Sequence, residues 1–392
     1  MKDFTRPKLE VADVFRKYGF SYKESHNLPL QALKAMSAIE NCRTESLGGH
    51  IDKCNHCDYQ RNSYNSCRNR HCPKCQGLQQ IKWLVKRESE LLPIRYFHLV
   101  FTLPNELNRL ALINQKVIYN ILLKAATETV IMLSSQKEHL GAKPGCISVL
   151  HTWGQNLMDH PHVHMIVTGG GLSPENKWIN SKKKFFLPVK VMSKVYRGKF
   201  MMMLKKAYSR KELCFEGSIK SLEEPGEFKK LVDNLYNKSW VVYAKKAFGN
   251  ASKVLTYLGR YTHRIAISNH RLVNMENSKV SFKWKDYSAN NAIKVMTVET
   301  NEFIRRFLLH VLPDGFFKIR YYGLYSSRNK KKNLILCCRS LGYKMTQNID
   351  LSSFTWQELL LKYTGVDIYK CPDCKKGTIS ITRIINPRAA PI

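Results

Sequence analysis

The chain has 392 residues and carries 64 Lys and Arg against 30 Asp and Glu, which leaves a formal net charge of +34. An excess of this size along a folded chain indicates a polyanionic partner, and nucleic acid is the commonest one. The hydrophobic content of 44%, with 17 Phe and 19 Tyr, supports sizeable cores and excludes a disordered binding tail. No apolar run approaches the roughly 18 residues of a membrane-spanning helix, and the N-terminus has no signal-peptide pattern. We therefore expect a soluble intracellular protein with no membrane partner.

Residues 1–92 are expected to form a small zinc-binding domain. Twelve cysteines in an intracellular chain indicate metal binding rather than disulfides. Two Cys-x-x-Cys pairs, Cys54 with Cys57 and Cys72 with Cys75, are separated by a loop. Paired knuckles of this kind are typical of tetrahedral Zn²⁺ ligation by four thiolates. The sequence therefore predicts a structural zinc ion on these four cysteines.

Further cysteines and histidines leave a second metal site open. Within the same stretch, a second zinc ion could use four more residues, or these could be ordinary buried or surface residues: Cys42, His50, Cys67 and His71. Residues 301–392 are expected to form a basic C-terminal region. There, Cys371 and Cys374 also have knuckle spacing but no clear second pair. The sequence does not decide whether this last pair binds metal.

Residues 93–300 alternate strand-like and helical segments. A β-rich segment at 94–104 ends at a proline and is followed by a helical pattern at 106–134. Two further strands are expected at 146–153 and 161–168, joined by a glycine turn. This order predicts an α+β fold built on an antiparallel or mixed sheet.

His162 and His164 flank one apolar residue in the last of these strands. Residues two apart in a strand point to the same face, so both imidazoles can bind one metal ion. Two imidazoles leave the coordination of Mg²⁺ or Mn²⁺ incomplete, and His151 on the preceding strand can reach across a hairpin. Gln155 and His160 are less favoured third ligands. A divalent ion held here would polarise a scissile phosphate as a Lewis acid.

Tyr257 and Tyr261 lie four residues apart in a segment with a helical pattern, which places both phenols on one helix face. A phenol titrates near ~10, so cations such as Arg260 and Arg264 would assist its attack on a metal-polarised phosphate. A phosphotyrosyl bond preserves the energy of the phosphodiester, so a free 3′-hydroxyl can reverse the step. Each pair alone is more often incidental or core packing. Their joint presence in a very basic chain favours breaking and rejoining of DNA strands.

The segment from Lys182 to Lys211 contains eleven Lys or Arg and no acidic residue, with Phe and Tyr interleaved. Basic side chains follow phosphates and aromatic rings stack on bases. We expect contact with single-stranded DNA, beginning at Lys182, Lys183 and Lys184. The competing interpretation is a solvated face.

Several motifs together carry a family resemblance. His162-Val163-His164 looks like the signature of HUH rolling-circle nucleases, and Phe101–Pro104 resembles their first strand motif. Five further pieces resemble, in this order, the two-tyrosine HUH transposases of rolling-circle insertion sequences of the IS91 type: Ser66–Gln76, His151–Gly154, His160–Leu172, Tyr257–Arg264 and His310–Phe316. The similarity covers roughly residues 28–325.

The resemblance implies a zinc-binding domain followed by a ferredoxin-like or RRM-like palm that nicks single-stranded DNA at the ends of an element. In that family, the residues matching Tyr257 and Tyr261 are the nucleophiles, and those matching His162 and His164 bind metal. We expect a cytoplasmic, bacterial, nucleoid-associated protein, with host replication proteins as further partners. No helicase is expected, because no Walker A loop is present. Two alternatives stay open: a plasmid-type replication initiator, and a non-catalytic zinc-knuckle protein that binds nucleic acid.

Overall fold

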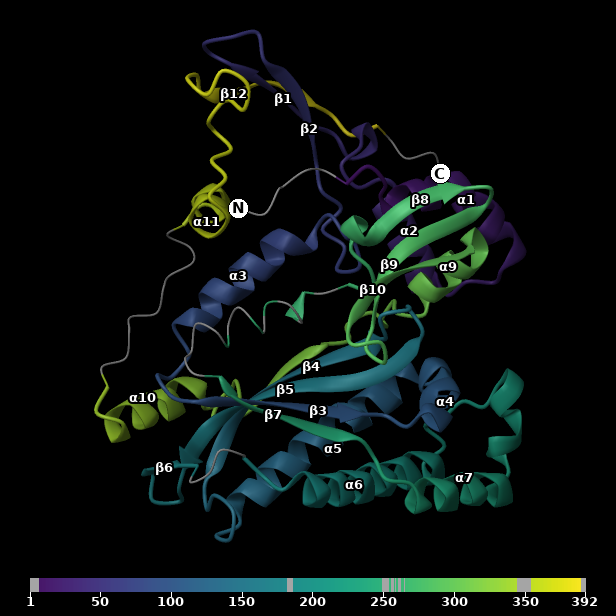
Figure 1. Ribbon diagram of the computed structural model, residues 1–392, viewed down its shortest axis with the longest axis vertical. Coiled ribbons are helices and arrows are strands. Elements are labelled where there is room, and N and C mark those ends of the chain that lie inside the picture. The colour runs from purple at the N-terminus through teal and green to yellow at the C-terminus, as the bar shows by residue number, and fades with distance from the viewer. Residues whose placement is uncertain are drawn as a thin grey trace.

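The computed structural model describes residues 7–181, 186–248, 254, 257, 259, 262–263, 265–343 and 354–388. In these parts of the chain, three antiparallel sheets are packed with helices (Figure 1). The predicted α+β class is confirmed.

A six-stranded sheet carries the histidine strand. Its hydrogen-bonded order is β11-β4-β5-β3-β7, with β6 paired to the end of β5, and every pairing is antiparallel. The strands are β3 (Tyr96–Thr102), β4 (Lys143–Trp153), β5 (Asp159–Leu172), β6 (Trp178–Asn180), β7 (Val242–Phe248) and β11 (Ile319–Gly323). β4 and β5 form a long hairpin, as the sequence predicts.

Helices cover one face of this sheet (Figure 1). This layer consists of η2 (Asn105–Leu107), α4 (Asn108–Ile113), α5 (Gln115–Ser135), α6 (Val189–Ser209), η3 (Gly217–Glu223) and α7 (Pro225–Asn237). Leu99 of β3 and Val163 and Met165 of β5 are buried in the core between the sheet and the helices. Because side chains alternate along a strand, His162 and His164 face the opposite side.

Among the described helices, α5 alone is long and apolar enough to cross a membrane by length and composition. No such run was expected from the sequence, and α5 corrects this expectation. In the fold, 67% of the apolar window of α5 is buried, and the helix lies against β4, β5 and α6. Its composition is therefore that of a core helix.

A second unit packs on the tip of the β4–β5 hairpin. It combines the N-terminal helices with a distant part of the chain: α1 (Val11–Ser25), α2 (Leu30–Glu40), η4 (Asn269–Arg271), β8 (Leu272–Glu276), β9 (Lys279–Asp286), β10 (Ala292–Glu299) and α9 (Thr300–Leu308). Phe15 of α1 meets Phe307 of α9 edge to face, with ring centroids 5.3 Å apart. Trp153 and Leu157 of the hairpin are buried in the same core.

The third sheet, at the top of Figure 1, has the order β12-β1-β2. Its strands are β1 (Gly49–Cys54), β2 (Gln60–Tyr64) and β12 (Ile379–Ile385), and η1 (Glu45–Leu47) precedes it. α3 (Gln76–Glu88) lies between this sheet and the large one, and α11 (Trp356–Thr364) contacts α3. α10 (Lys330–Ser340) lies near one end of the large sheet.

The structure departs from the expected division into 1–92, 93–300 and 301–392. The C-terminal stretch is no separate region, because β11 belongs to the large sheet and β12 pairs with β1. Similarly, α9 belongs with α1. The chain returns twice to its N-terminal part, and a reading of local composition cannot detect such long-range pairing.

Candidate active site and metal centres

Three histidines meet on the sheet face opposite α5 and α6. In the β4–β5 ladder His151 is paired with His162, and His164 lies two residues further along β5. One ring nitrogen of each of the three imidazoles lies within 4.8 Å of those of the other two. The Nε2 atoms of His162 and His164 are 3.1 Å apart. The structure thus brings together the predicted pair and the predicted third ligand.

The Nδ1 atoms of His162 and His164 each lie within hydrogen-bond distance of a neighbouring residue. Nδ1 of His162 lies 2.6 Å from the carbonyl oxygen of His160 and donates to it. Nδ1 of His164 lies 2.9 Å from Nε2 of His98. A histidine that binds metal usually donates its other N–H to such a partner, which fixes its tautomer and orientation. The Nε2 atoms of His162 and His164 face each other at 3.1 Å, and the three imidazoles together fit the donor set of a metal ion.

The less favoured third ligands lie elsewhere. Gln155 donates from its amide to the hydroxyl of Tyr287, at 3.1 Å. His160 contributes its backbone carbonyl, and its ring lies 5.0 Å from that of His162. Neither belongs to the histidine cluster, whereas His151 does.

His98 of β3 belongs to the site, although no sequence motif indicated it. Its Nδ1 lies 3.2 Å from the hydroxyl of Tyr257, so one imidazole bridges His164 and the tyrosine. Burial, together with the nearby Lys245 and His162, lowers the pKa of His98 to about 4. His98 is therefore neutral at physiological pH. The signal available was its place in the alternation of β3, since it faces away from the apolar positions Phe97 and Leu99.

Lys245 of β7 was also missed. It is paired with His98 in the β3–β7 ladder, and its ammonium lies 5.8 Å from the ring centroid of Tyr257. The side chain of Lys245 is exposed. A cation here can attract a phosphate to the tyrosine.

Tyr257 belongs to a helical segment that packs on α3. Gly259 accepts a hydrogen bond from the amide of Gln80 at 2.5 Å, and a Cβ at Gly259 would lie 3.2 Å from Leu84. The zinc-binding part of the chain thus supports the tyrosine segment. Six predicted site residues lie outside the described residues: Tyr261, Arg260, Arg264, Lys182, Lys183 and Lys184.

His310 packs against the turn of the β4–β5 hairpin and contacts two of its residues. Leu157 in this turn has φ 63°, a left-handed conformation that is strained for a residue with a side chain. His310 is buried and lies 3.0 Å from the carbonyl oxygen of Leu157 and 3.1 Å from the hydroxyl of Thr152. These contacts stabilise the conformation of the turn. Because the turn connects β4 and β5, they also favour the strand register that pairs His151 with His162.

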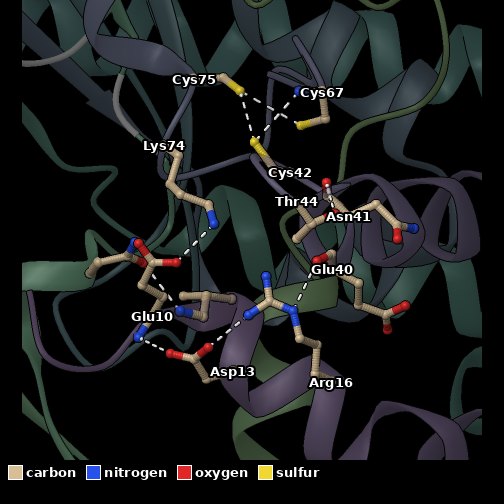
Figure 2. Close-up of polar contacts among 12 residues, drawn as sticks. Glu10, Asp13, Arg16, Glu40, Asn41, Cys42, Thr44, Cys67, Lys74 and Cys75 are labelled. Atoms are coloured by element: carbon tan, nitrogen blue, oxygen red, sulfur yellow. Dashed lines mark hydrogen bonds and ion pairs between the residues drawn. The ribbon is translucent and has the colours of Figure 1, made fainter. Parts of the chain in front are cut away.

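The cysteines form two clusters of four, grouped differently from the prediction. The first contains Cys42, Cys67, Cys72 and Cys75. Sγ of Cys75 lies 3.5 Å from that of Cys42 and 3.6 Å from that of Cys67 (Figure 2). Lys74 forms a buried ion pair with Glu10 at 2.8 Å, which joins this cluster to the start of α1 (Figure 2).

The second cluster contains Cys54, Cys57, Cys371 and Cys374. The predicted set of Cys54, Cys57, Cys72 and Cys75 is therefore corrected. Cys54 and Cys57 lie at the β1–β2 turn, whereas Cys72 and Cys75 lie at the start of α3. Motif spacing groups Cys-x-x-Cys pairs that are close in the sequence. It cannot predict a partner pair more than 300 residues away.

His50 and His71 belong to neither cluster, so the predicted second set is corrected as well. Nε2 of His50 lies 3.3 Å from Oδ1 of Asp52. His71 is held by Arg70, whose Nε lies 3.3 Å from its Nε2. Burial lowers the pKa of His71 to about 3. Cys42 and Cys67, the other two members of that set, complete the first cluster.

Comparisons with known proteins agree with this architecture. Residues 14–103 match a family model described as "Transposase zinc-binding domain", and residues 145–333 match one described as "Putative transposase". The chain belongs to the transposase family of IS91-type insertion sequences, which confirms the resemblance read from the motifs.

Two relatives illustrate the similarity. The chain is 44% identical over 385 residues to "Putative transposase y4qJ" of Sinorhizobium fredii, covering 97% of each chain. It is 27% identical over 339 residues to the "Transposase for insertion sequence element IS801" of Pseudomonas savastanoi pv. phaseolicola, covering 85% of this chain and 79% of that one. No solved structure matches the chain significantly.

Proposed function

We propose that this transposase nicks and rejoins single-stranded DNA at the ends of its insertion sequence through a 5′-phosphotyrosine intermediate, and so drives rolling-circle transposition. The observation that carries the proposal is the chain of contacts from the Tyr257 hydroxyl to His98, at 3.2 Å, and from His98 to His164, at 2.9 Å. A phenol held beside a three-histidine cluster has the parts that a metal-assisted tyrosine nuclease needs.

His151, His162 and His164 would hold a divalent ion, Mg²⁺ or Mn²⁺. An all-imidazole set is more typical of transition metals than of Mg²⁺, which favours Mn²⁺. When bound, the ion supplies Lewis-acid polarisation of the scissile phosphate.

The hydrogen-bond directions assign His98 a definite part. If His164 binds metal through Nε2, its Nδ1 carries the proton and donates to Nε2 of His98. Neutral His98 then carries its own proton on Nδ1 and donates it to the Tyr257 oxygen. Because His98 donates to the Tyr257 oxygen, it does not act as the base. Its hydrogen bond stabilises the phenolate after the phenol has lost its proton to solvent.

The Tyr257 oxygen forms a bond to phosphorus while the bond from phosphorus to the 3′ oxygen breaks. The products are a 5′-phosphotyrosine and a free 3′-hydroxyl. Lys245 attracts the phosphate toward the ring. In the return step a 3′-hydroxyl attacks the phosphotyrosine and the tyrosine oxygen leaves, so strands are rejoined without hydrolysis. Tyr261, assisted by Arg260 and Arg264, would perform the second transfer while Tyr257 is still esterified.

The other predicted partners fit the same function. The net charge of +34 suits single-stranded DNA, with Lys182, Lys183 and Lys184 following its backbone. We infer that Cys42, Cys67, Cys72 and Cys75 hold a structural Zn²⁺ in the zinc-binding domain. The activity would take place in the cytoplasm at the nucleoid, alongside host replication proteins. The similarity to two transposases favours this function over a replication initiator.

The decisive experiment looks for the covalent intermediate. The chain is incubated with Mn²⁺ and a single-stranded element end labelled at its 3′ terminus, and adducts are separated on a denaturing gel. Tyr257→Phe and Tyr261→Phe should each retain some adduct, and the double variant should form none. Tyr236→Phe, on α7 in the helical layer, is the matched control and should behave like the wild type.

Two outcomes would contradict the proposal. An adduct that persists in the double variant and maps to another residue would make this helix a scaffold. DNA binding by the wild type without any adduct, with either Mg²⁺ or Mn²⁺, would favour the non-catalytic nucleic-acid-binding alternative.

A further inference from the structure

The two ends of the chain meet at the second cysteine cluster. Cys54 and Cys57 come from the β1–β2 turn, and Cys371 and Cys374 come from the knuckle before β12. Sγ of Cys54 lies 3.8 Å from that of Cys374, and Sγ of Cys57 lies 3.7 Å from that of Cys371. The paired residues are 320 and 314 positions apart in the chain.

These distances suit a metal ion and not a disulfide. A Zn–S bond of about 2.3 Å places two tetrahedral ligands about 3.8 Å apart, whereas the sulfurs of a disulfide are about 2.05 Å apart. All four sulfurs lie within 4.8 Å of one another. A set of four thiolates is the usual ligand set of structural zinc.

Backbone amides point at the sulfurs from both knuckles. The N–H of His56 donates to Sγ of Cys54 and that of Gly377 donates to Sγ of Cys374, each at 3.3 Å. Such donors stabilise the negative charge that four thiolates bring to a metal. Each knuckle therefore supplies a backbone donor to one of its own sulfurs, although the two knuckles come from opposite ends of the chain.

Gly377 lets the two knuckles close on each other. A Cβ at this position would lie 2.3 Å from Sγ of Cys54 and 2.7 Å from Cβ of His56. The adjacent Thr378 exchanges two hydrogen bonds with Asn55, at 2.8 and 3.1 Å. The approach of the C-terminal knuckle is therefore closely fitted to this partner.

The small sheet has little apolar core of its own. The buried apolar cluster beside it consists of Cys54, Cys371 and Ile379. Most of β12 is exposed, including Ile381 and Ile384, which are 58% and 65% exposed. A sheet with so little burial needs a metal or a disulfide to be stable.

We propose that Cys54, Cys57, Cys371 and Cys374 bind a second structural zinc ion, which joins the C-terminal segment to the N-terminal zinc-binding domain. Half of this site lies outside the stretch 14–103 that matches the zinc-binding family model. The domain is then completed by residues from the far end of the chain. The site is independent of the catalytic proposal.

Zinc content of the full-length chain tests the proposal. Metal analysis and native mass spectrometry should find two zinc ions per wild-type chain and one in Cys371→Ser/Cys374→Ser. Gly377→Ala, which keeps all four ligands, should also lose the second ion. Cys214→Ser, at an exposed cysteine outside both clusters, should keep both ions. A double variant with the same zinc content as the wild type would overturn the proposal.

Alkylation of the wild-type chain gives an answer even if these variants fail to fold. Cys371 and Cys374 should resist iodoacetamide until a chelator is added, whereas exposed Cys214 should react at once. Peptide mass spectrometry reads each position separately. Reaction of Cys371 and Cys374 at the rate of Cys214 without chelator would overturn the proposal, as would a Cys57–Cys371 disulfide in the purified protein.

Discussion

Nε2 of His98 lies 2.9 Å from Nδ1 of His164, on the side of the His164 ring away from His162. This contact joins β3 to β5, the strand that carries two of the proposed metal ligands. The other ring nitrogen of His98 contacts the hydroxyl of Tyr257. The orientation of the His98 imidazole therefore depends on both the proposed metal site and the proposed nucleophile. His98 is a positioning residue in this arrangement.

Replacing His98 by Ala should weaken metal binding and slow adduct formation together. Loss of a partner that orients a metal-bound histidine typically costs about 10- to 100-fold in metal affinity or activity. We expect the Mn²⁺ midpoint for adduct formation to rise by about this factor. His98→Gln can still accept from His164 and donate to the phenol, and should restore part of the loss. His139→Ala, in a surface turn, is the control; an unchanged Mn²⁺ midpoint in His98→Ala would show that His98 only fills space.

Replacing His162 or His164 by Ala should abolish nicking while leaving DNA binding close to that of the wild type. A metal ion supplies several kcal/mol of transition-state stabilisation, so a rate loss of roughly 1,000-fold is expected. His160→Ala is a strict control, because the His162 ring is held by the His160 backbone carbonyl, which the change retains. Metal-dependent cleavage that survives in His164→Ala would refute the assignment of this ligand.

The histidine site was largely predictable because it depends on local geometry. Alternation along β5 places His162 and His164 on one face, and a hairpin places His151 beside them, so sequence spacing translates directly into contact. His98 was not predicted as a site residue, because it comes from a separate strand, β3, and belongs to no motif. Its partner Lys245 comes from a third strand, β7. Strand order within a sheet is a long-range property that spacing does not encode.

In the fold as well, features set by local sequence were predictable, and features set by long-range contacts were not. The strands at 94–104, 146–153 and 161–168 correspond to β3, β4 and β5, because their apolar patterns are local. The cysteine grouping was mistaken because it assumed that adjacent knuckles share an ion. Pairing of β1 with β12, and of α1 with α9, depends on contacts across most of the chain. Only the folded structure reveals them.

Neutralising Lys182, Lys183 and Lys184 together should weaken binding of single-stranded DNA and flatten its salt dependence. Each lost phosphate contact should reduce the slope of log K against log salt by roughly 0.7. Binding is measured with a fluorescent oligonucleotide at several salt concentrations. Lys229→Gln/Lys230→Gln, on α7, removes exposed charge elsewhere and serves as the comparison. If the two variants change the slope equally, the segment contributes only general charge and no specific contact.

The half-buried carboxyl of Asp159, at the start of the histidine strand, should make stability depend on pH. Among the described residues its Oδ1 has no hydrogen-bond partner. Burial raises the pKa of Asp159 to about 6, although Arg305 and Arg109 lower it in part. The ordinary value is about 3.9, so the folded chain holds this proton more tightly than the unfolded chain. The contribution of Asp159 to the free energy of unfolding is therefore greatest below about pH 4 and falls as the pH rises to about 6.

Asp159→Asn removes this titration. At pH 8 the variant should be more stable than the wild type by roughly 1–2 kcal/mol, a range that allows for the partial exposure of the side chain. The difference in melting temperature between the two proteins should shrink as the pH falls from 6 to 4. Asp233→Asn, at an exposed position of α7, should show no such trend. A difference that stays constant from pH 4 to pH 8 would mean that Asp159 is ionised throughout, and that its carboxylate has a partner in the folded chain.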